Sequence, residues 1–468
     1  MKFLWSPAVL GLLFSVFNTE RIAAQTKGES YDFFKKGFND PPPQAHPKTY
    51  WWWLNGNTDT ARLMKELTAM KNAGIVGVDI FDIGARAPNN PNKMIPAGAP
   101  FMGREALATL VKVIKKATEY QMEVGLSLSS SWNAGGSWIT PEHAGKSLYY
   151  STIKAQGPGI QKLTIPFPTI STLDERGKPR VIIYNAQGKP VYAKEVVVLA
   201  YPSGDAKAYP DTSKIVNISA FFDSNRDELN WNVPAGSWEI QRFVCSSSGE
   251  QLKYYSDSSA GPIIDHFDSV ATRVHFMYFI DHLKPLLGDF TKTALKNFYL
   301  ASFEATGSVW TPSLPAEFKK INGYEVYKLL PSLFNDKMFD KIVHEKFKHD
   351  FNETISELMI RNHYGKGKEI ANSYGLKLIS ESGGPGPPLH NVPVEGIKAL
   401  GALDIPRGEF WNKHAVYDKD SIDLLMLVKE VSAAAHMYHR KIVEEESFTS
   451  FQHWTEGPFD LKPLGDRA

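Results

Sequence analysis

Strand-like and helix-like hydrophobic patterns alternate along the first part of the chain. Apolar residues recur at helical spacing over residues 63–70 and 107–114. Continuous apolar runs, each bounded by turn residues, precede, separate and follow these helices at residues 50–54, 75–81 and 122–128. Strands that alternate with helices in this way predict parallel β-α units.

The rhythm changes between residues 148 and 264. This stretch contains strand patterns only, such as residues 180–184, 196–199 and 238–244, separated by Gly, Pro, Asn and Asp turns. Short strands with frequent turns are typical of antiparallel β domains. We therefore expect an inserted β-sandwich over residues 148–264.

The β-α rhythm returns after residue 265. Helical spacing covers residues 267–287 and 421–438, and four further strands are expected at residues 298–303, 376–380, 402–405 and 441–444. With no eighth strand before residue 468, the pattern predicts an α/β fold, a (β/α)8-type TIM barrel lacking its last unit. Its strands 1–3 would lie in residues 25–147 and its strands 4–7 in residues 265–468.

The N-terminus has the composition of a secretory leader. Lys2 precedes a short apolar run that ends in small residues near Ala24, so residues 1–24 are predicted to be a signal peptide and the protein to be secreted or periplasmic. The alternative is a buried N-terminal helix. No other apolar run is long enough to span a bilayer. The lone Cys245 allows no intrachain disulfide and is expected to be a small buried strand residue.

Composition narrows the possible partners. The chain has 52 basic and 51 acidic residues, a net charge of +1, which gives no electrostatic footprint for nucleic acid or an anionic membrane. No obligate protein partner is evident from the sequence. The sequence contains neither a His-Glu-x-x-His zinc motif nor a Gly-x-Ser-x-Gly nucleophile elbow. Zinc hydrolase and serine hydrolase chemistry are therefore not expected.

Four glutamates stand at or just beyond the predicted strand ends. Glu304, Glu381, Glu409 and Glu446 would meet at one face of the barrel, the face where such barrels carry their active sites. Hydrolysis of a glycosidic bond needs two carboxyl groups, one protonated and one ionised. Any one such glutamate is more often a helix-start charge or an ion-pair partner, but four in register favour glycoside hydrolysis.

Aromatic residues are expected at the same face. Rigid aromatic planes suit the apolar faces of sugar rings, although at least half of these tryptophans should be core residues. Those we take as candidate sugar contacts are Trp53, Trp132 and Trp411, with Glu381 as a polar contact.

An ordered set of short motifs resembles glycoside hydrolase family 106. The set runs from about residue 47 to the C-terminus and comprises residues 53–57, 77–82, 302–304 with 310–311, 317–318 with 323–324, 381–386, 408–411 and 446–450. Family members are longer than this chain, so the resemblance is to the N-terminal part of a longer member. One departure is Ala301, at a position where the family often carries an acidic residue.

The resemblance implies an inverting α-L-rhamnosidase that acts on pectic or related rhamnose-containing plant glycans. Carried over by motif, Glu304 would be the general acid, and Glu446, with Glu409 close behind, the general base. Some members hold calcium at the sugar site. Asn55 and Asp82 would be sugar contacts, and Asn57 a calcium ligand.

Two alternatives stay open. A retaining β-glycosidase would place its acid on strand four and its nucleophile on strand seven, with carboxyl groups roughly 5 Å apart, where an inverting enzyme needs roughly 6.5–9.5 Å. That superfamily usually has Asn before its acid, where this chain has Phe303. The other alternative is a truncated, non-catalytic carbohydrate-binding protein.

Overall fold

The computed structural model describes most of the chain beyond its N-terminus. The described residues are 30–85, 90–174, 177–203, 211–305, 309–382, 394–411, 422–450 and 455–468. The predicted signal peptide over residues 1–24 lies outside them, as does the Gly-Pro stretch at 383–388.

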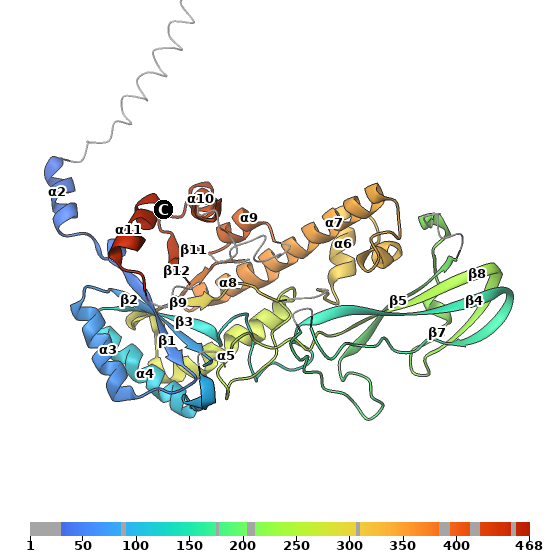
Figure 1. The fold of residues 1–468 in the computed structure, drawn as a ribbon, viewed down its shortest axis with the longest axis horizontal. Coiled ribbons are helices and arrows are strands. Elements are labelled where there is room, and N and C mark those ends of the chain that lie inside the picture. Colours follow the sequence, from blue (N-terminus) through green and yellow to red (C-terminus); the bar gives the residue numbers. More distant parts are fainter. Residues whose placement is uncertain are drawn as a thin grey trace, which may run out of the picture.

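A seven-stranded parallel sheet forms the body of the molecule (Figure 1). Every neighbouring pair is parallel, because each strand returns to the sheet after a crossover on its outer side. In sheet order the strands are β1 (Lys48–Leu54), β2 (Gly77–Ile83), β3 (Glu123–Ser130), β9 (Leu295–Leu300), β10 (Lys377–Ser380), β11 (Ile405–Trp411) and β12 (Glu444–Thr449).

The sheet curls so strongly that its two edges approach each other. Lys48 on β1 lies 3.2 Å, Nζ to Oε1, from Glu444 on β12, although these strands stand at opposite ends of the strand order. The predicted β-α barrel architecture is therefore confirmed as a half-barrel. Closure into a complete eight-stranded barrel is not seen among the described residues, which contribute seven strands to this sheet.

Helices cover the convex face of the half-barrel (Figure 1). Asp59 caps the first of them by accepting hydrogen bonds from the backbone N–H groups of residues 61 and 62. A continuous apolar core lies between sheet and helices and includes Leu67, Leu110 and Phe276. The main helices are α3 (Thr60–Asn72), α4 (Arg104–Glu119), α5 (Ser269–Leu287), α8 (Lys366–Ser373), α9 (Gly396–Gly401) and α10 (Ile422–Met437).

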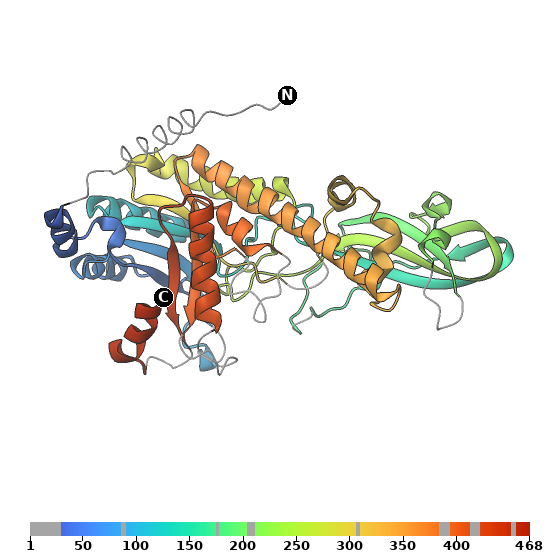
Figure 2. The same ribbon diagram turned by 90° about the horizontal axis from the view of Figure 1, so that it is seen from above.

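The long helix α7 (Lys341–Met359) connects the two parts of the molecule. In Figure 2 it runs from the sheet body toward the arm that the inserted strands form. A π-helical turn at Ile360–Gly365 continues it into α8. The remaining helices are α2 (Tyr31–Asn39) near the N-terminus, α6 (Leu314–Asn322) beside α7, and α11 (Pro458–Arg467) beside β12.

The inserted segment forms one antiparallel sheet, not the two-sheet sandwich that we expected. Its described strands are β4 (Lys146–Thr164), β5 (Ala193–Pro202), β6 (Val216–Asn217), β7 (Phe222–Asp223) and β8 (Glu228–Ser247). β4 and β8 pair along nearly their whole lengths, which produces the extended arm of Figure 1. Cys245 is buried in β8, and burial raises the pKa of its thiol to about 12.

No helix in the described part of the chain has the length and apolar character needed to cross a membrane.

Candidate active site

Three glutamates meet at the carboxyl ends of the last three parallel strands. Glu409 on β11 and Glu446 on β12 are direct register partners, so their side chains emerge side by side on one face. Glu381 follows the end of β10 on the neighbouring strand. The three side chains, here called the acidic trio, each offer a carboxylate oxygen within 4.8 Å of the other two.

The strands extend further than the sequence pattern predicted. We expected Glu409 just past the sixth strand and Glu446 at the end of the seventh, but β11 continues to Trp411 and β12 to Thr449. Both glutamates are therefore held inside regular strands. Because strand side chains alternate, Arg407, Glu409 and Trp411 share one face of β11. The indole N–H of Trp411 donates to Glu409 Oε1 at 2.9 Å.

Two buried tyrosines and an arginine surround Glu381 of the acidic trio. Tyr50 and Tyr299 both donate their phenol groups to Glu381 Oε1, at 2.9 and 2.7 Å. Burial, and then the charge of Glu381, raise the pKa of both phenols well above the usual value, so they remain donors. Arg407 lies 4.5 Å from the Tyr299 ring centroid and pairs with Asp79 and Glu444. This arrangement fixes Glu381 in one orientation.

Burial and nearby negative charge raise the pKa of two members of the acidic trio, Glu381 and Glu409. Burial, with the charge of Glu446 next, raises the pKa of Glu381 to about 8, although Arg407 opposes the shift. Burial, followed by Glu381 and Glu446, raises the pKa of Glu409 well above its ordinary value. Three carboxylates this close cannot all be ionised near neutral pH unless a cation joins them.

Glu304 stands on the loop that follows β9. Its backbone N–H donates to Asn133 Oδ1 at 2.7 Å, which ties this loop to the end of β3. Its carboxylate accepts a hydrogen bond from Ser302 Oγ at 3.1 Å and forms an ion pair with Lys253. The charge of Lys253 also lowers the pKa of Glu409, which places the ammonium group near both glutamates.

Lys253 is a site residue that the sequence analysis missed. It comes from the end of the inserted segment, and its backbone N–H and C=O both bond to Trp132, at 3.3 and 3.2 Å. No local pattern marks this lysine. Only the return of the inserted segment over the strand ends brings it to the glutamates.

Trp132 and Trp52 bring aromatic surface to the concave side of the sheet. Trp132 lies 5.3 Å from Phe81 and 6.1 Å from Trp52, measured between ring centroids. Trp52 stacks on Phe81 at 5.7 Å and is 47% exposed. Trp52 thus presents a large exposed ring at the face where tryptophans were expected.

A family model described as alpha-L-rhamnosidase matches residues 39–214 and 202–468, nearly all of the described chain. The chain belongs to glycoside hydrolase family 106. The resemblance inferred from the motifs is thus confirmed.

One solved structure and one curated protein are similar to this family member. A rhamnosidase from Novosphingobium sp. PP1Y shares its fold, with a TM-score of 0.70 at 18% identity over 92% of this chain and 55% of that one. A protein of Formosa agariphila, provisionally named a beta-glucuronidase, is 27% identical over 98% of this chain. This family member spans 38% of the length of that relative.

Trp53 does not reach the site of this family member as we had predicted. It is buried on the convex side, edge-on to Trp51 at 5.8 Å between ring centroids, in the core beneath the helices. The side chains of residues 50–53 alternate, so Tyr50 and Trp52 face inward and Trp51 and Trp53 face outward. Trp53 is a packing residue.

Asn55 and Asp82 are anchors within the protein, where sugar contacts had been expected. The amide of Asn55 is fully buried; it donates to Asp257 Oδ2 at 3.1 Å and accepts from the Asp257 N–H at 2.9 Å. Asp82 accepts a hydrogen bond from Ser256 Oγ at 2.7 Å and another from Ser130 Oγ. Burial raises the pKa of Asp82 to about 6.

Asn57 is exposed, and its amide nitrogen bonds to the backbone oxygens of Asn55 and Pro96 within its own loop. The acidic trio offers a donor set better suited to calcium, which prefers several carboxylate oxygens. Glu381 Oε2 is buried and has no hydrogen-bond partner among the described residues, as expected of an oxygen aimed at a cation.

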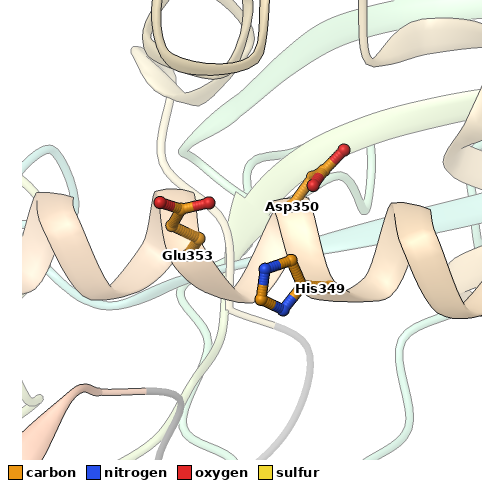
Figure 3. Close-up of side chains that lie close together, drawn as sticks. All are labelled: His349, Asp350 and Glu353. Carbon is orange, nitrogen blue, oxygen red and sulfur yellow. The ribbon is translucent and has the colours of Figure 1, made fainter.

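A second group of possible metal ligands lies on α7, away from the strand ends. His349 and Asp350 are neighbours on one turn of the helix, and Glu353 lies on the next (Figure 3). Asp350 already accepts a hydrogen bond from the Tyr324 phenol at 2.7 Å. His349 and Glu353 are exposed, and we assign this group no role.

Proposed function

We propose that this chain carries the catalytic face of an inverting α-L-rhamnosidase that acts on rhamnose-containing plant glycans such as pectins. The observation that carries the proposal is the convergence of Glu381, Glu409 and Glu446 at the strand ends of a rhamnosidase-family half-barrel. Glu304 is linked to this group through Lys253. We further propose that the protein is exported, because residues 1–24 have the composition of a leader.

In the proposed reaction Glu304 acts as the general acid. Its carboxyl proton passes to the glycosidic oxygen as the bond between that oxygen and the anomeric carbon breaks. A water molecule attacks the anomeric carbon from the opposite face, and a carboxylate takes its proton, so the configuration inverts.

Glu446 is the better candidate for the general base. It is the member of the acidic trio that is only half-buried, so it is more accessible to a water molecule than its two buried neighbours. The raised pKa of the buried Glu409 favours its protonated form, which cannot accept a proton from water. Glu409 remains the second choice.

We propose that a calcium ion binds at the acidic trio and assists the reaction. Glu381 and Glu409 would hold the ion, with Glu446 at the edge of the same group. Bound there, calcium would neutralise the clustered carboxylates and bind sugar hydroxyl groups.

Hydrolysis of a β-glucuronide is a second candidate function. It is supported by the name of the relative from Formosa agariphila and by Lys253, a cation at the site that could pair with a sugar carboxylate. It lacks the support of the family match, which names α-L-rhamnosidase.

Release of 4-nitrophenol from its α-L-rhamnoside tests the proposal, with the β-D-glucuronide as comparison substrate. We expect the 468-residue chain to cleave the rhamnoside. Glu446→Gln should lower kcat by about 10²- to 10⁴-fold, the contribution of a general base. Glu304→Gln should lower kcat by a similar factor on a rhamnosyl disaccharide and by much less on the 4-nitrophenyl substrate, because 4-nitrophenolate leaves without a proton. Glu353→Gln, an exposed position on α7, is the matched control and should keep full activity.

Preferential cleavage of the glucuronide would favour the second candidate. A folded chain that binds rhamnosides but cleaves neither substrate would instead support the non-catalytic carbohydrate-binding alternative.

A further inference from the structure

Lys253 places a positive charge directly beside the proposed general acid. Its ammonium group pairs with the Glu304 carboxylate, and the lysine side chain is 27% exposed while that of Glu304 is 6% exposed. The ammonium nitrogen lies 5.1 Å from the centroid of the Tyr254 ring, which meets Trp132 edge-on at 5.9 Å. A partly exposed cation therefore contacts both the acid and the Tyr254 ring, and Trp132 packs against that ring.

Hydrogen bonds hold the segment that carries Lys253 on three strand ends. Trp132, after β3, pairs with Lys253 itself, and Gly84, after β2, donates its N–H to the Tyr254 carbonyl at 2.8 Å. Asn55, after β1, and Asp82, on β2, hold residues 256 and 257. A Cβ added at Gly84 would lie 2.1 Å from the Tyr255 carbonyl oxygen, so the segment packs as closely as the backbone allows.

This anchoring gives the buried Asn55 and Asp82 their role. They were expected to touch sugar, and instead they fix the position of a charged group that does face the site. A cation held in advance binds an anion without a further ordering cost.

The position of Lys253 relative to the acid determines what it can bind. A general acid donates its proton to the oxygen that joins two sugars, so a group beside it faces the leaving-group sugar. When Glu304 carries that proton, its carboxyl group no longer compensates the positive charge of Lys253. An anionic group on the leaving sugar would restore the balance of charge.

We propose that Lys253 binds the carboxylate of a uronic acid in the leaving-group position, so that the preferred substrates are α-L-rhamnosyl uronates. This inference rests on the proposed function, in particular on Glu304 as the acid. Trp132 and Tyr254 would pack against the uronic acid ring.

Hydrolysis of α-L-rhamnosyl-(1→4)-D-glucuronate and of its methyl ester tests this inference, since the ester replaces the charged carboxylate by a neutral group that is larger by one methyl. We expect the native chain to cleave the acid with a kcat/KM about tenfold higher than the ester, the contribution of one charged hydrogen bond. Lys253→Gln should cleave both equally, and Lys253→Arg should keep the preference. Lys162→Gln on β4, 68% exposed, is the matched control and should also keep it.

Binding gives a second measurement that does not depend on turnover. In calorimetric titrations, Glu304→Gln should bind the glucuronate disaccharide more tightly than the native chain does, because the Glu304 carboxylate no longer competes with the substrate carboxylate for Lys253. Its affinity for the methyl ester should not change. Adding Lys253→Gln to this variant should remove the preference for the acid.

The outcomes separate the two proposals. Equal treatment of acid and ester by the native chain, or a preference that survives Lys253→Gln, would overturn the role of Lys253 while leaving the rhamnosidase proposal intact. A charge preference in binding without cleavage of any rhamnoside would overturn the proposed function while leaving Lys253 as an anion-binding residue.

Discussion

At the scale of single residues, neighbours in the sequence have opposite roles. Trp52 and Trp53 are adjacent, yet Trp52 is 47% exposed on the concave side and Trp53 is 6% exposed in the core. The apolar run at residues 50–54 predicted the strand correctly. The run did not show which face of the strand is exposed to solvent, because both faces carry aromatic residues.

The two tryptophans should respond differently to truncation. Trp53→Ala should lower the free energy of unfolding by about 3–5 kcal/mol, as expected for a large buried ring. Trp52→Ala should leave the melting temperature nearly unchanged and raise KM for rhamnosides by about two- to tenfold, the contribution of one aromatic contact. Thermal melts and steady-state kinetics on both variants check this. The opposite pattern would mean that the faces of β1 are assigned wrongly.

The raised pKa of Asp82 predicts a pH-dependent stability. Its pKa is about 6 in the folded protein against an ordinary value of 3.8, so the protonated form favours folding. That contribution is complete below about pH 3.8 and is lost as the pH rises through 6. Asp82→Asn, which stays neutral, should therefore gain up to about 3 kcal/mol over the native chain between pH 4 and pH 7.

Denaturant melts at these two pH values measure the gain. Asp281→Asn, an exposed position on α5, is the control and should show no such difference. If Asp82 instead bound sugar, Asp82→Asn would raise KM for the substrate and would leave the pH dependence of stability unchanged.

At the scale of elements, the sequence predicted the scaffold better than the site. Alternating strands and helices predicted the parallel sheet. Three of the four glutamates expected at one face, Glu381, Glu409 and Glu446, lie within one group at its strand ends. The fourth, Glu304, stands on the loop after β9, beside Lys253. Lys253 could not be predicted, because its position depends on tertiary contacts of the inserted segment with three strand ends. The single sheet of that segment was also unpredictable, since antiparallel strands show the same patterns whether or not a second sheet covers them.

The acidic trio, built from three adjacent strands, should make stability depend on calcium. A bound divalent ion relieves the repulsion among the carboxylates, and ligands that bind only the folded state stabilise it. We expect millimolar calcium to raise the melting temperature and a chelator to reverse the rise. Glu381→Gln should abolish the response, whereas Glu353→Gln on α7 should keep it. An unchanged melting temperature in the native chain would contradict calcium binding at the trio.

At the scale of the whole molecule, one core joins the half-barrel to the root of the arm. The same apolar cluster contains Leu126 of β3 and Phe243 of β8, so the inserted sheet is packed onto the barrel at its base. The distal arm has a separate core around Trp231. This packing explains how the inserted segment can hold Lys253 close to strand ends that are distant from it in the sequence.

The central claim is that the glutamates at these strand ends catalyse hydrolysis of α-L-rhamnosides with inversion. Time-resolved proton NMR of 4-nitrophenyl α-L-rhamnoside hydrolysis tests it most directly, because the anomeric proton reports the configuration of the first sugar released. We expect β-L-rhamnose first, with later equilibration to the α anomer, and release slowed by about 10²- to 10⁴-fold in Glu446→Gln. Initial release of α-L-rhamnose would show retention and contradict the proposed roles of Glu304 and Glu446.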